Sequence, residues 1–285
     1  MRLIAHISDL HFGYNDPLLA KALSKSLAQI RPNVLVVSGD LVEHATDAEF
    51  QSARDFLDSL PGPQIIVPGN HDLPFYNLWR RFTEGIDKYR RFITKYLQHA
   101  FSDDELAIVG ADSAHLYPVK GGKITDSQLD ELVGLFSSFP SSLIRVLVTH
   151  HPFDLPEPSN PHLLIGHSRR AVSRLAPVVD ILLAGHVHLS STGSTSTRYK
   201  LEGHAMAFVQ AGTAISDRNK GEKNSFNVIR TGSVESHEKQ IIVDRYSWAK
   251  EENRFECKDS KEYRLGEQGW AEFHLSAADV NPIGH

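Results

Sequence analysis

The stretch Ile66–Pro74, IVPGNHDLP, places three polar residues directly behind a short apolar run. The apolar residues are typical of a buried strand, and the Pro-Gly pair ends it. A turn needs one Asn or Asp, whereas here Asn70, His71 and Asp72 follow one another. So many polar side chains at one strand end exceed what a turn needs, and they raise the question of why one of them is a neutral amide.

The same pattern recurs along the chain, where five predicted strands end in His, Asp or Asn. The polar residues are Asp9 and His11 after Arg2–Ser8, Asp40 after Asn33–Gly39, Asn70–Asp72 after the strand above, His150 and His151 after Leu143–Thr149, and His186 and His188 after Val178–Ala184. Because the carboxyl ends of parallel strands lie at one edge of an α/β sheet, we expect these distant residues to meet there.

Between the strand ends, the apolar periodicity alternates between strand and helix. Helical stripes are predicted over Pro17–Ile30, Asp47–Leu60, about Tyr76–Leu97, Thr125–Phe139 and Ser168–Ala176. After Ser190 the pattern is of strands joined by turns, without a clear helix. This order predicts an α/β fold with two sheets packed together rather than a simple doubly wound sheet. No segment rich in Pro, Gly or Ser divides the chain, so we expect one domain over residues 1–285, with a β-rich part from about residue 190.

The composition is that of an ordinary globular protein, with 285 residues, 41% hydrophobic and 23% charged residues and a formal net charge of −5. The chain has no long basic block, which argues against nonspecific binding to duplex DNA. The one cysteine, Cys257, cannot form an intramolecular disulfide. No signal peptide is recognisable, and no apolar run reaches the ~18 residues of a membrane span. We therefore expect a cytoplasmic protein without membrane contact.

Each motif alone has an ordinary explanation, since Gly-Asp after a strand is common in turns and a lone His-x-His is usually a coincidence. Together they supply imidazoles, carboxylates and one amide, without a thiolate, at five strand ends of one chain. This donor set predicts a metal site. Three of the sets follow a glycine, at Gly39, Gly69 and Gly185, where the backbone can turn sharply and approach a bound group.

In type and order, these blocks resemble those of the calcineurin-like metallophosphoesterase superfamily. The blocks are Asp9-x-His11, Gly39-Asp40, Gly69-Asn70-His71-Asp72, His150 and Gly185-His186-x-His188. Within the superfamily, the opening HISDLHFG is similar to that of the bacterial class III cyclic nucleotide phosphodiesterases. The resemblance, which covers about Asp9–His188, implies a four-layer αββα sandwich of two mixed β-sheets flanked by helices, with the metal site at the carboxyl ends of the strands.

The resemblance also implies a role for each residue. One divalent ion would be held by Asp9, His11, His188 and a bridging Asp40. The other would be held by Asp40, Asn70, His150 and His186. His71 would donate a proton or contact a phosphoryl oxygen, and Asp72 would orient it. The family spacing His-x-Pro indicates His150 as the ligand, with His151 packed behind it.

This ligand set gives a reason for the neutral amide at Asn70. Two divalent cations bring four positive charges, and only Asp9 and Asp40 bring negative ones, so about two positive charges remain before water binds. That excess lowers the pKa of a bridging water and attracts a phosphate ester. The expected reaction is attack of metal-bound hydroxide on phosphorus.

The same donor set narrows the choice of metal. Nitrogen and oxygen ligands without Cys suit Mn²⁺ or Fe, and also Zn²⁺ or Co²⁺, rather than a dedicated Mg²⁺ or Ca²⁺ cage. A purple acid phosphatase would carry a Tyr three residues after the bridging Asp40, where this chain has Glu43. An Fe(III)–tyrosinate site is therefore not expected, and Glu43 is placed in the loop or behind the ligands.

Candidates for substrate binding are His44, His115 and Arg218 in the loops beyond the ligands, although such side chains are mostly solvated. We expect hydrolysis of small phosphodiesters, first of cyclic nucleotides of the cAMP type. Glycerophosphodiesters, nucleotide-sugar lipids and nucleic acid are the alternatives, and nucleic acid would need a basic groove that the composition does not favour. An inactive scaffold would have lost ligands, and none is missing. Some relatives suggest a homodimer.

Overall fold

The strands of the computed structural model form two mixed sheets. The structure describes residues 1–74, 79, 84, 86–115, 121–156, 160–201, 203–218, 220–233 and 239–273. The seven-stranded sheet has the order β13-β12-β11-β10-β1-β2-β3 and the six-stranded sheet the order β4-β5-β6-β7-β9-β8. The first contains β1 (Arg2–Ile7), β2 (Val34–Val37), β3 (Gln64–Ile66), β10 (Ser225–Ser233), β11 (Lys239–Ala249), β12 (Arg254–Gly266) and β13 (Gly269–Glu272). The second contains β4 (His99–Ser102), β5 (Leu106–Gly110), β6 (Ile144–Val148), β7 (Ile181–Ala184), β8 (Ser191–Ser194) and β9 (Ala207–Gln210).

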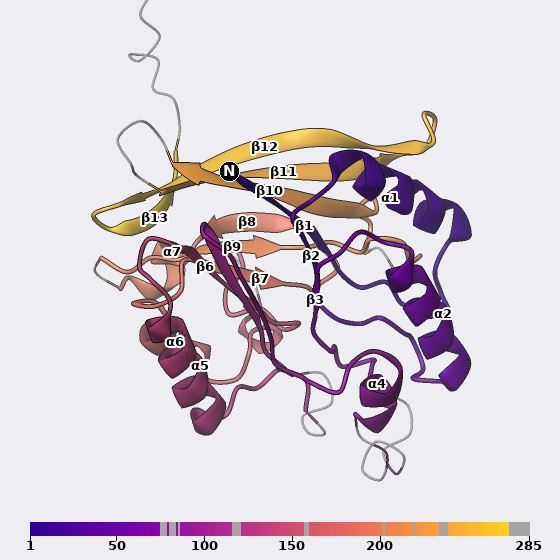
Figure 1. Ribbon diagram of the computed structural model, residues 1–285, viewed down its shortest axis with the longest axis horizontal. Coiled ribbons are helices and arrows are strands. Elements are labelled where there is room, and N and C mark those ends of the chain that lie inside the picture. Colours follow the sequence, from indigo (N-terminus) through magenta and orange to yellow (C-terminus); the bar gives the residue numbers. More distant parts are fainter. Residues whose placement is uncertain are drawn as a thin grey trace, which may run out of the picture.

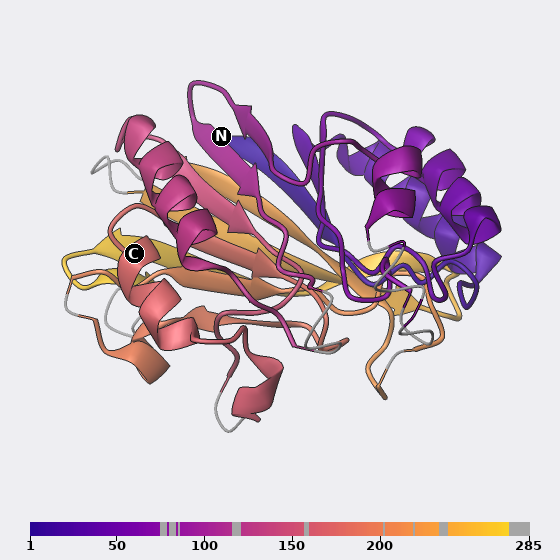
Figure 2. The ribbon, with the colours of Figure 1, turned by 90° about the horizontal axis from the view of Figure 1, so that it is seen from below.

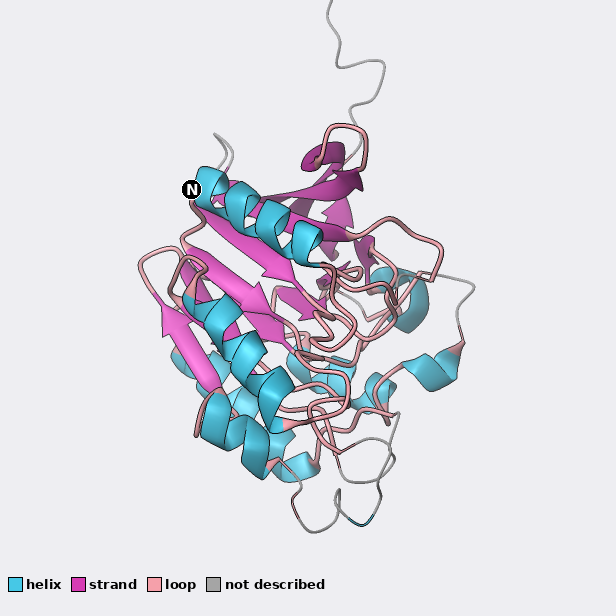
Figure 3. Cartoon of the chain, turned by 90° about the vertical axis from the view of Figure 1, so that its right-hand side faces the viewer, coloured by secondary structure: helices cyan, strands magenta, loops and turns pink. Residues whose placement is uncertain are grey.

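Each sheet has a parallel part that ends at the same edge of the molecule. Strands β1, β2 and β3 are parallel to one another, as are β5, β6, β7 and β9. The antiparallel additions are β10–β13 in the first sheet and β4 and β8 in the second. Loops from both sheets gather at the arrowheads of the strands (Figure 3).

Helices cover the outer face of each sheet. Helices α1 (Pro17–Ile30), α2 (Asp47–Asp58) and α4 (Asp87–Phe92) pack on the first sheet, and α5 (Asp126–Ser138), α6 (Ser168–Leu175) and α7 (Ser196–Tyr199) on the second, whereas the one-turn η1 (Pro161–Leu163) lies in a loop. The two groups of helices flank the sheets in Figures 1 and 2. The expected αββα sandwich is therefore confirmed.

Alternating side chains of the strands build the apolar layers. In β1, Ala5 and Ile7 contribute to the core under the helices, whereas Ile4 faces the core between the two sheets. Helices α1, α2 and α5 begin at the side-chain caps Asp16, Thr46 and Thr125, and Thr125 forms a capping box with Gln128. Local sequence signals and tertiary packing thus agree over most of the fold.

Some elements differ from the sequence-based expectation. Of the helix predicted over about Tyr76–Leu97, residues 75–78, 80–83 and 85 lie outside the described residues, and α4 ends at Phe92 rather than Leu97. The expectation of strands without a helix after Ser190 is wrong at α7, and the edge strand β4 and the one-turn η1 were not predicted. These three elements are only three or four residues long, which is too short for a hydrophobic period to stand out.

The C-terminal strands complete the sheet that the N-terminal strands begin, because β1 lies between β2 and β10. Residues far apart in sequence therefore share one hydrogen-bonded sheet and one core. On this ground we propose that residues 1–285 belong to a single domain.

Candidate metal centre

Side chains from five strand ends converge at the carboxyl edge of the two sheets. The loops are tied by backbone hydrogen bonds within each sheet, from Asp9 N to Gly39 O (3.0 Å) and from Gly185 N to His150 O (2.9 Å). Between the sheets, His186 N donates to Asp9 Oδ2 (3.1 Å). The expected meeting of these distant motifs is therefore observed.

The backbone at this edge is unusual, since several non-glycine residues have positive φ. They are Asp9 (53°), His11 (46°), Asp40 (51°), His186 (75°) and His188 (60°). The left-handed region costs an L-residue about 1 kcal/mol or more, and such residues cluster at functional sites. These turns explain how both side chains of Asp-x-His and His-x-His reach one place.

Two of the glycines singled out in the sequence allow this close approach. A Cβ at Gly69 would collide with the carboxylate of Asp40, and one at Gly185 would collide with Ser8 and lie 2.7 Å from Asp9 Oδ2. Any larger residue at either position would displace a carboxylate of the site.

The first group of possible ligand atoms comprises Asp9 Oδ1, His11 Nε2, Asp40 Oδ2 and His188 Nε2. His188 Nε2 lies 3.3 Å from Asp9 Oδ1 and 3.4 Å from His11 Nε2. His11 Nε2 is 3.7 Å from Asp9 Oδ1 and 3.8 Å from Asp40 Oδ2. Ligand atoms about 2.0–2.2 Å from one cation lie roughly 3.0–3.5 Å from each other, so this group nearly has the spacing of a coordination shell.

The second group is centred on His150 Nε2. This atom lies 3.3 Å from Asp40 Oδ2, from Asn70 Oδ1 and from His186 Nδ1. Asp40 Oδ2 is therefore a member of both groups, as a bridging carboxylate must be. The two groups fit two neighbouring cations.

Hydrogen bonds on the far side of the rings orient the imidazoles. His150 Nδ1 lies 2.7 Å from Ser38 O, and His188 Nδ1 lies 2.7 Å from Arg218 O. Because a carbonyl oxygen can only accept, each Nδ1 carries the proton and each Nε2 presents a lone pair to the centre.

The charges at the centre also fit cations. Burial acts to raise the pKa of Asp9, but His188 and His11 outweigh it and hold this pKa below its usual range. Burial acts to lower the pKa of His11 and of His150, yet the surrounding carboxylates raise both to about 9. Asp9 Oδ1 accepts no hydrogen bond from the described residues. The carboxylates thus draw positive charge into the site, which divalent ions would supply in place of protons.

His71 lies beside the first group, with its ring 5.1 Å from that of His11. Its Nδ1 is 3.0 Å from Glu43 O and its Nε2 is 3.2 Å from Arg218 Nη1. Its backbone N–H donates to Asp40 Oδ1 (2.8 Å). In this arrangement the proton is on Nδ1, and Nε2 accepts a hydrogen bond from Arg218.

The role expected for Asp72 needs correction. Its carboxylate accepts backbone N–H groups from Gly69 (2.8 Å), Leu41 (2.8 Å) and Val42 (3.1 Å), not the ring of His71. Asp72 therefore holds the loop after β2 against the turn after β3, and it affects His71 only through that turn.

The three candidates for substrate binding lie in different surroundings. Arg218 reaches the site, where its Nη1 contacts both carboxylate oxygens of Glu43 as well as His71. His44 is 43% exposed, with its ring 5.7 Å from that of Tyr14. His115 Nε2 lies 2.8 Å from Lys123 O, two residues from the Ser113 that contacts His151.

His151 is buried behind the second group. Its Nδ1 lies 3.0 Å from Ser113 Oγ, and its ring packs 4.4 Å from that of His186. The ligand-type atoms of His150, His151 and His186 lie within 4.8 Å of one another. Of the two neighbouring histidines, His150 is the one whose Nε2 lies 3.3 Å from Asp40 Oδ2 and Asn70 Oδ1, which fits the ligand role that the resemblance implies for it.

A family model for calcineurin-like phosphoesterases matches residues 2–190. The chain belongs to the calcineurin-like phosphoesterase family. The predicted metal-dependent phosphoric ester hydrolase is thereby confirmed, and this family together with the clusters of His and Asp supports a dinuclear metal site.

Among its relatives, the chain is 26% identical over 208 residues to the probable glycerophosphodiester phosphodiesterase GpdQ of Arcobacter nitrofigilis, in a match that covers 67% of this chain and 73% of the relative. It is also 26% identical over 196 residues to the 3′,5′-cyclic adenosine monophosphate phosphodiesterase CpdA of Escherichia coli, covering 61% and 66% of the two chains. Among solved structures, the purple acid phosphatase PPD1 of yellow lupin superposes with a TM-score of 0.66 at 10% identity, covering 92% of this chain and 53% of that one. This last likeness shows the fold alone.

Proposed function

We propose that this calcineurin-like phosphoesterase is a binuclear metal phosphodiesterase that acts on small phosphodiesters. The observation that carries the proposal is the position of Asp40 Oδ2, which lies within 3.8 Å of His11 Nε2 and 3.3 Å of His150 Nε2. One carboxylate oxygen shared by two ligand groups is the arrangement that two adjacent cations require.

In this proposal, one ion is held by Asp9, His11, Asp40 and His188, and the other by Asp40, Asn70, His150 and His186. When bound, the two ions supply an activated water at neutral pH and offset the negative charge of the phosphoryl oxygens. The donor set favours Mn²⁺ or Fe, with Zn²⁺ or Co²⁺ as alternatives. Asn70 contributes an oxygen without cancelling positive charge.

Side chains around the ions bind and orient the ester. We assign Arg218 as the contact to a phosphoryl or leaving-group oxygen, because its guanidinium contacts His71 beside the first ligand group and its side chain is 35% exposed. His71 Nε2 accepts from Arg218, so His71 can donate a proton to the leaving group only after it has taken one up. His71 thus serves as a proton relay, with Arg218 holding the oxygen that receives the proton.

The substrate we place first is a cyclic nucleotide of the cAMP type, and the alternative is a glycerophosphodiester. Two relatives at equal identity carry these two activities in their names. Both are singly charged phosphodiesters, and this shared chemistry fits the proposed centre.

The decisive experiment loads purified protein with Mn²⁺ and assays bis(p-nitrophenyl) phosphate, 3′,5′-cAMP, 2′,3′-cAMP and glycerophosphocholine side by side. The proposal expects hydrolysis of the first and a loss of about a hundredfold or more in His188→Ala. Full activity of His188→Ala would refute the site, and no turnover of either cyclic nucleotide would refute the preferred substrate.

A homodimer, a cytoplasmic location and the absence of a nucleic-acid partner stay predictions. Within the described segments, the structure has no helix of the length and apolar character that crossing a membrane requires.

A further inference from the structure

Glu43 is a buried carboxylate that joins three functional side chains. It follows Asp40 by three residues and its side chain is 2% exposed. Its Oε2 lies 3.0 Å from His11 Nδ1, and its Oε1 and Oε2 lie 2.8 and 2.7 Å from Arg218 Nη1. Its backbone carbonyl lies 3.0 Å from His71 Nδ1. One residue therefore touches a proposed metal ligand, the proposed proton relay and the proposed phosphoryl contact.

The cluster His11, Glu43 and His71 has the composition of a third metal site. Two contacts argue against this interpretation. Both oxygens of Glu43 are bound to the guanidinium of Arg218, which would have to leave before a cation entered. His11 also presents its other nitrogen, Nε2, to the first ligand group. The cluster is instead an arginine–carboxylate pair at the rim of the dinuclear centre.

We propose that Glu43, by cancelling the charge of Arg218 at this rim, makes the site prefer singly charged phosphodiesters over doubly charged phosphomonoesters. Glu43 is a positioning residue in this account, since it acts through Arg218 and His11. The inference rests on the proposed function and deepens it, because it names the charge class of the substrate.

The physical argument is one of charge balance. A phosphomonoester carries nearly two negative charges at neutral pH, and a phosphodiester carries one. An unpaired arginine beside the ions would stabilise the additional negative charge of the monoester. Paired with Glu43, Arg218 still donates hydrogen bonds but adds no net charge, so the monoester loses this advantage.

The test compares Glu43→Gln, Arg218→Gln and the double variant on two substrates with the same leaving group, bis(p-nitrophenyl) phosphate and p-nitrophenyl phosphate. One unit of charge near the reacting group is expected to change the ratio of the two kcat/KM values by about tenfold. Glu43→Gln should raise kcat/KM for the monoester relative to that for the diester, and Arg218→Gln should lower it. The double variant should return to within about threefold of the wild-type ratio, because its net charge is again that of the wild type.

A measurement without turnover separates this inference from the proposed function. Calorimetry gives the affinities of inorganic phosphate and dimethyl phosphate for the same metal-loaded proteins, and the same pattern of ratios is expected. If the wild type hydrolyses neither ester, the proposed function fails, while the two affinities still decide the role of Glu43.

Controls exclude a general structural effect. Metal content should be equal in all variants, and Glu43→Asp should keep the wild-type ratio because it keeps the charge. Asp244→Asn removes a carboxylate that binds Arg230 through two hydrogen bonds, 2.8 and 2.9 Å, away from the centre, and should leave the ratio unchanged. The inference is overturned if Glu43→Gln leaves the ratio of the kcat/KM values and the ratio of the affinities at their wild-type values. It is also overturned if the ratios of the double variant differ from the wild-type ratios as much as those of the single variants do.

Discussion

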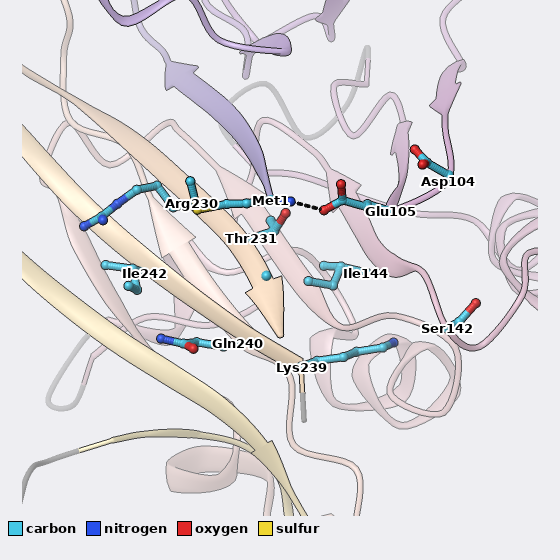
Figure 4. A pocket seen from close by; sticks show the side chains of 11 residues that line it. Met1, Asp104, Glu105, Ser142, Ile144, Arg230, Thr231, Lys239, Gln240 and Ile242 are labelled. Atoms are coloured by element: carbon cyan, nitrogen blue, oxygen red, sulfur yellow. Dashed lines mark ion pairs between the residues drawn. The ribbon is translucent and has the colours of Figure 1, made fainter. Parts of the chain in front are cut away.

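The two opposite edges of the parallel strands both collect charged residues, but they use them differently. At the amino edge, a cavity of about 530 Å³ opens between the sheets and is lined by Met1, Glu105, Arg230 and Lys239, among others (Figure 4). There the amino group of Met1 lies 2.6 Å from Glu105 Oε2, and Lys239 Nζ donates to Leu143 O (2.6 Å). At the carboxyl edge, the buried carboxylates of Asp9, Asp40 and Glu43 lie among imidazoles, and Asp9 Oδ1 accepts no hydrogen bond from the described residues.

The difference shows that the candidate site is recognised by how its charged groups are placed, and not by the size of a cavity. Pairs between opposite charges stabilise a surface and leave nothing for a ligand to neutralise. Buried carboxylates that share a space, held by strained backbone, are costly unless a ligand compensates them. Four experiments with five variants test this contrast.

The largest effect is expected for Asp40→Asn at the carboxyl edge. It removes the negative charge from the oxygen shared by both ligand groups, so both ions should bind more weakly. We expect kcat/KM for bis(p-nitrophenyl) phosphate to fall about a thousandfold, or ~4 kcal/mol of transition-state stabilisation. Elemental analysis should show fewer than two ions per chain. Wild-type metal content would contradict the bridging role.

The second largest effect is expected for a glycine-to-alanine substitution at the carboxyl edge, with the same substitution at the amino edge as its control. Gly185→Ala places a Cβ 2.7 Å from Asp9 Oδ2, whereas a Cβ at Gly232, beside the amino-edge cavity, meets no atom within 4 Å. Because a small misplacement of a site residue costs about a hundredfold in rate, Gly185→Ala should lose that much activity. Gly232→Ala should keep wild-type kcat and KM, and equal activities of the two variants would contradict the close packing at Gly185.

A stability effect without a catalytic one is expected for Lys239→Met. It removes the hydrogen bond to Leu143 O and the 3.4 Å ion pair with Asp180, whose carboxylate keeps Arg145 (3.1 Å). Denaturant unfolding should show a loss of about 1–2 kcal/mol, with unchanged kcat/KM. A catalytic defect at wild-type stability would mean that the amino edge takes part in the reaction.

The smallest effect is expected for Glu105→Gln. Its carboxylate pairs with the amino group of Met1 (2.6 Å) and with Arg2 Nη1 (3.0 Å). The side chains of Met1 and Glu105 are 66% and 33% exposed, so water and salt screen these ion pairs, and Arg2 keeps its pair with Asp103 (2.7 Å). The free energy of unfolding should change by less than about 0.5 kcal/mol. A larger loss in the free energy of unfolding, still present at high salt, would contradict the screening of these ion pairs by water and salt.

The sequence was sufficient to predict the position of those site residues that directly follow their own strand. Each ligand follows its own strand, so alternation and polar strand ends placed Asp9, Asp40 and His150 at one edge. The resemblance then assigned the ligands, with Asp40 as the bridge, and the distances from Asp40 Oδ2 to His11 Nε2 (3.8 Å) and His150 Nε2 (3.3 Å) fit that assignment.

Contacts between loops of distant elements could not be predicted. The pair Glu43–Arg218 joins residues 175 positions apart, and no periodicity relates them. Asp72 was expected to orient the neighbouring His71, but its carboxylate accepts the backbone N–H groups of Leu41 and Val42 in the loop after β2 and of Gly69 in its own turn. The short strand β4 owes its existence to pairing with β5 rather than to its own sequence.

The central place of β1 in its sheet has a consequence for biosynthesis. Arg2 pairs with Thr231, so the strand that presents Asp9 finds its antiparallel neighbour only after more than two hundred further residues have been synthesised. Until then one edge of β1 stays open and prone to mispairing on the ribosome. The segment that matches the family, residues 2–190, lacks β10, the antiparallel neighbour of β1, and we expect metal uptake to await release of the C-terminal strands.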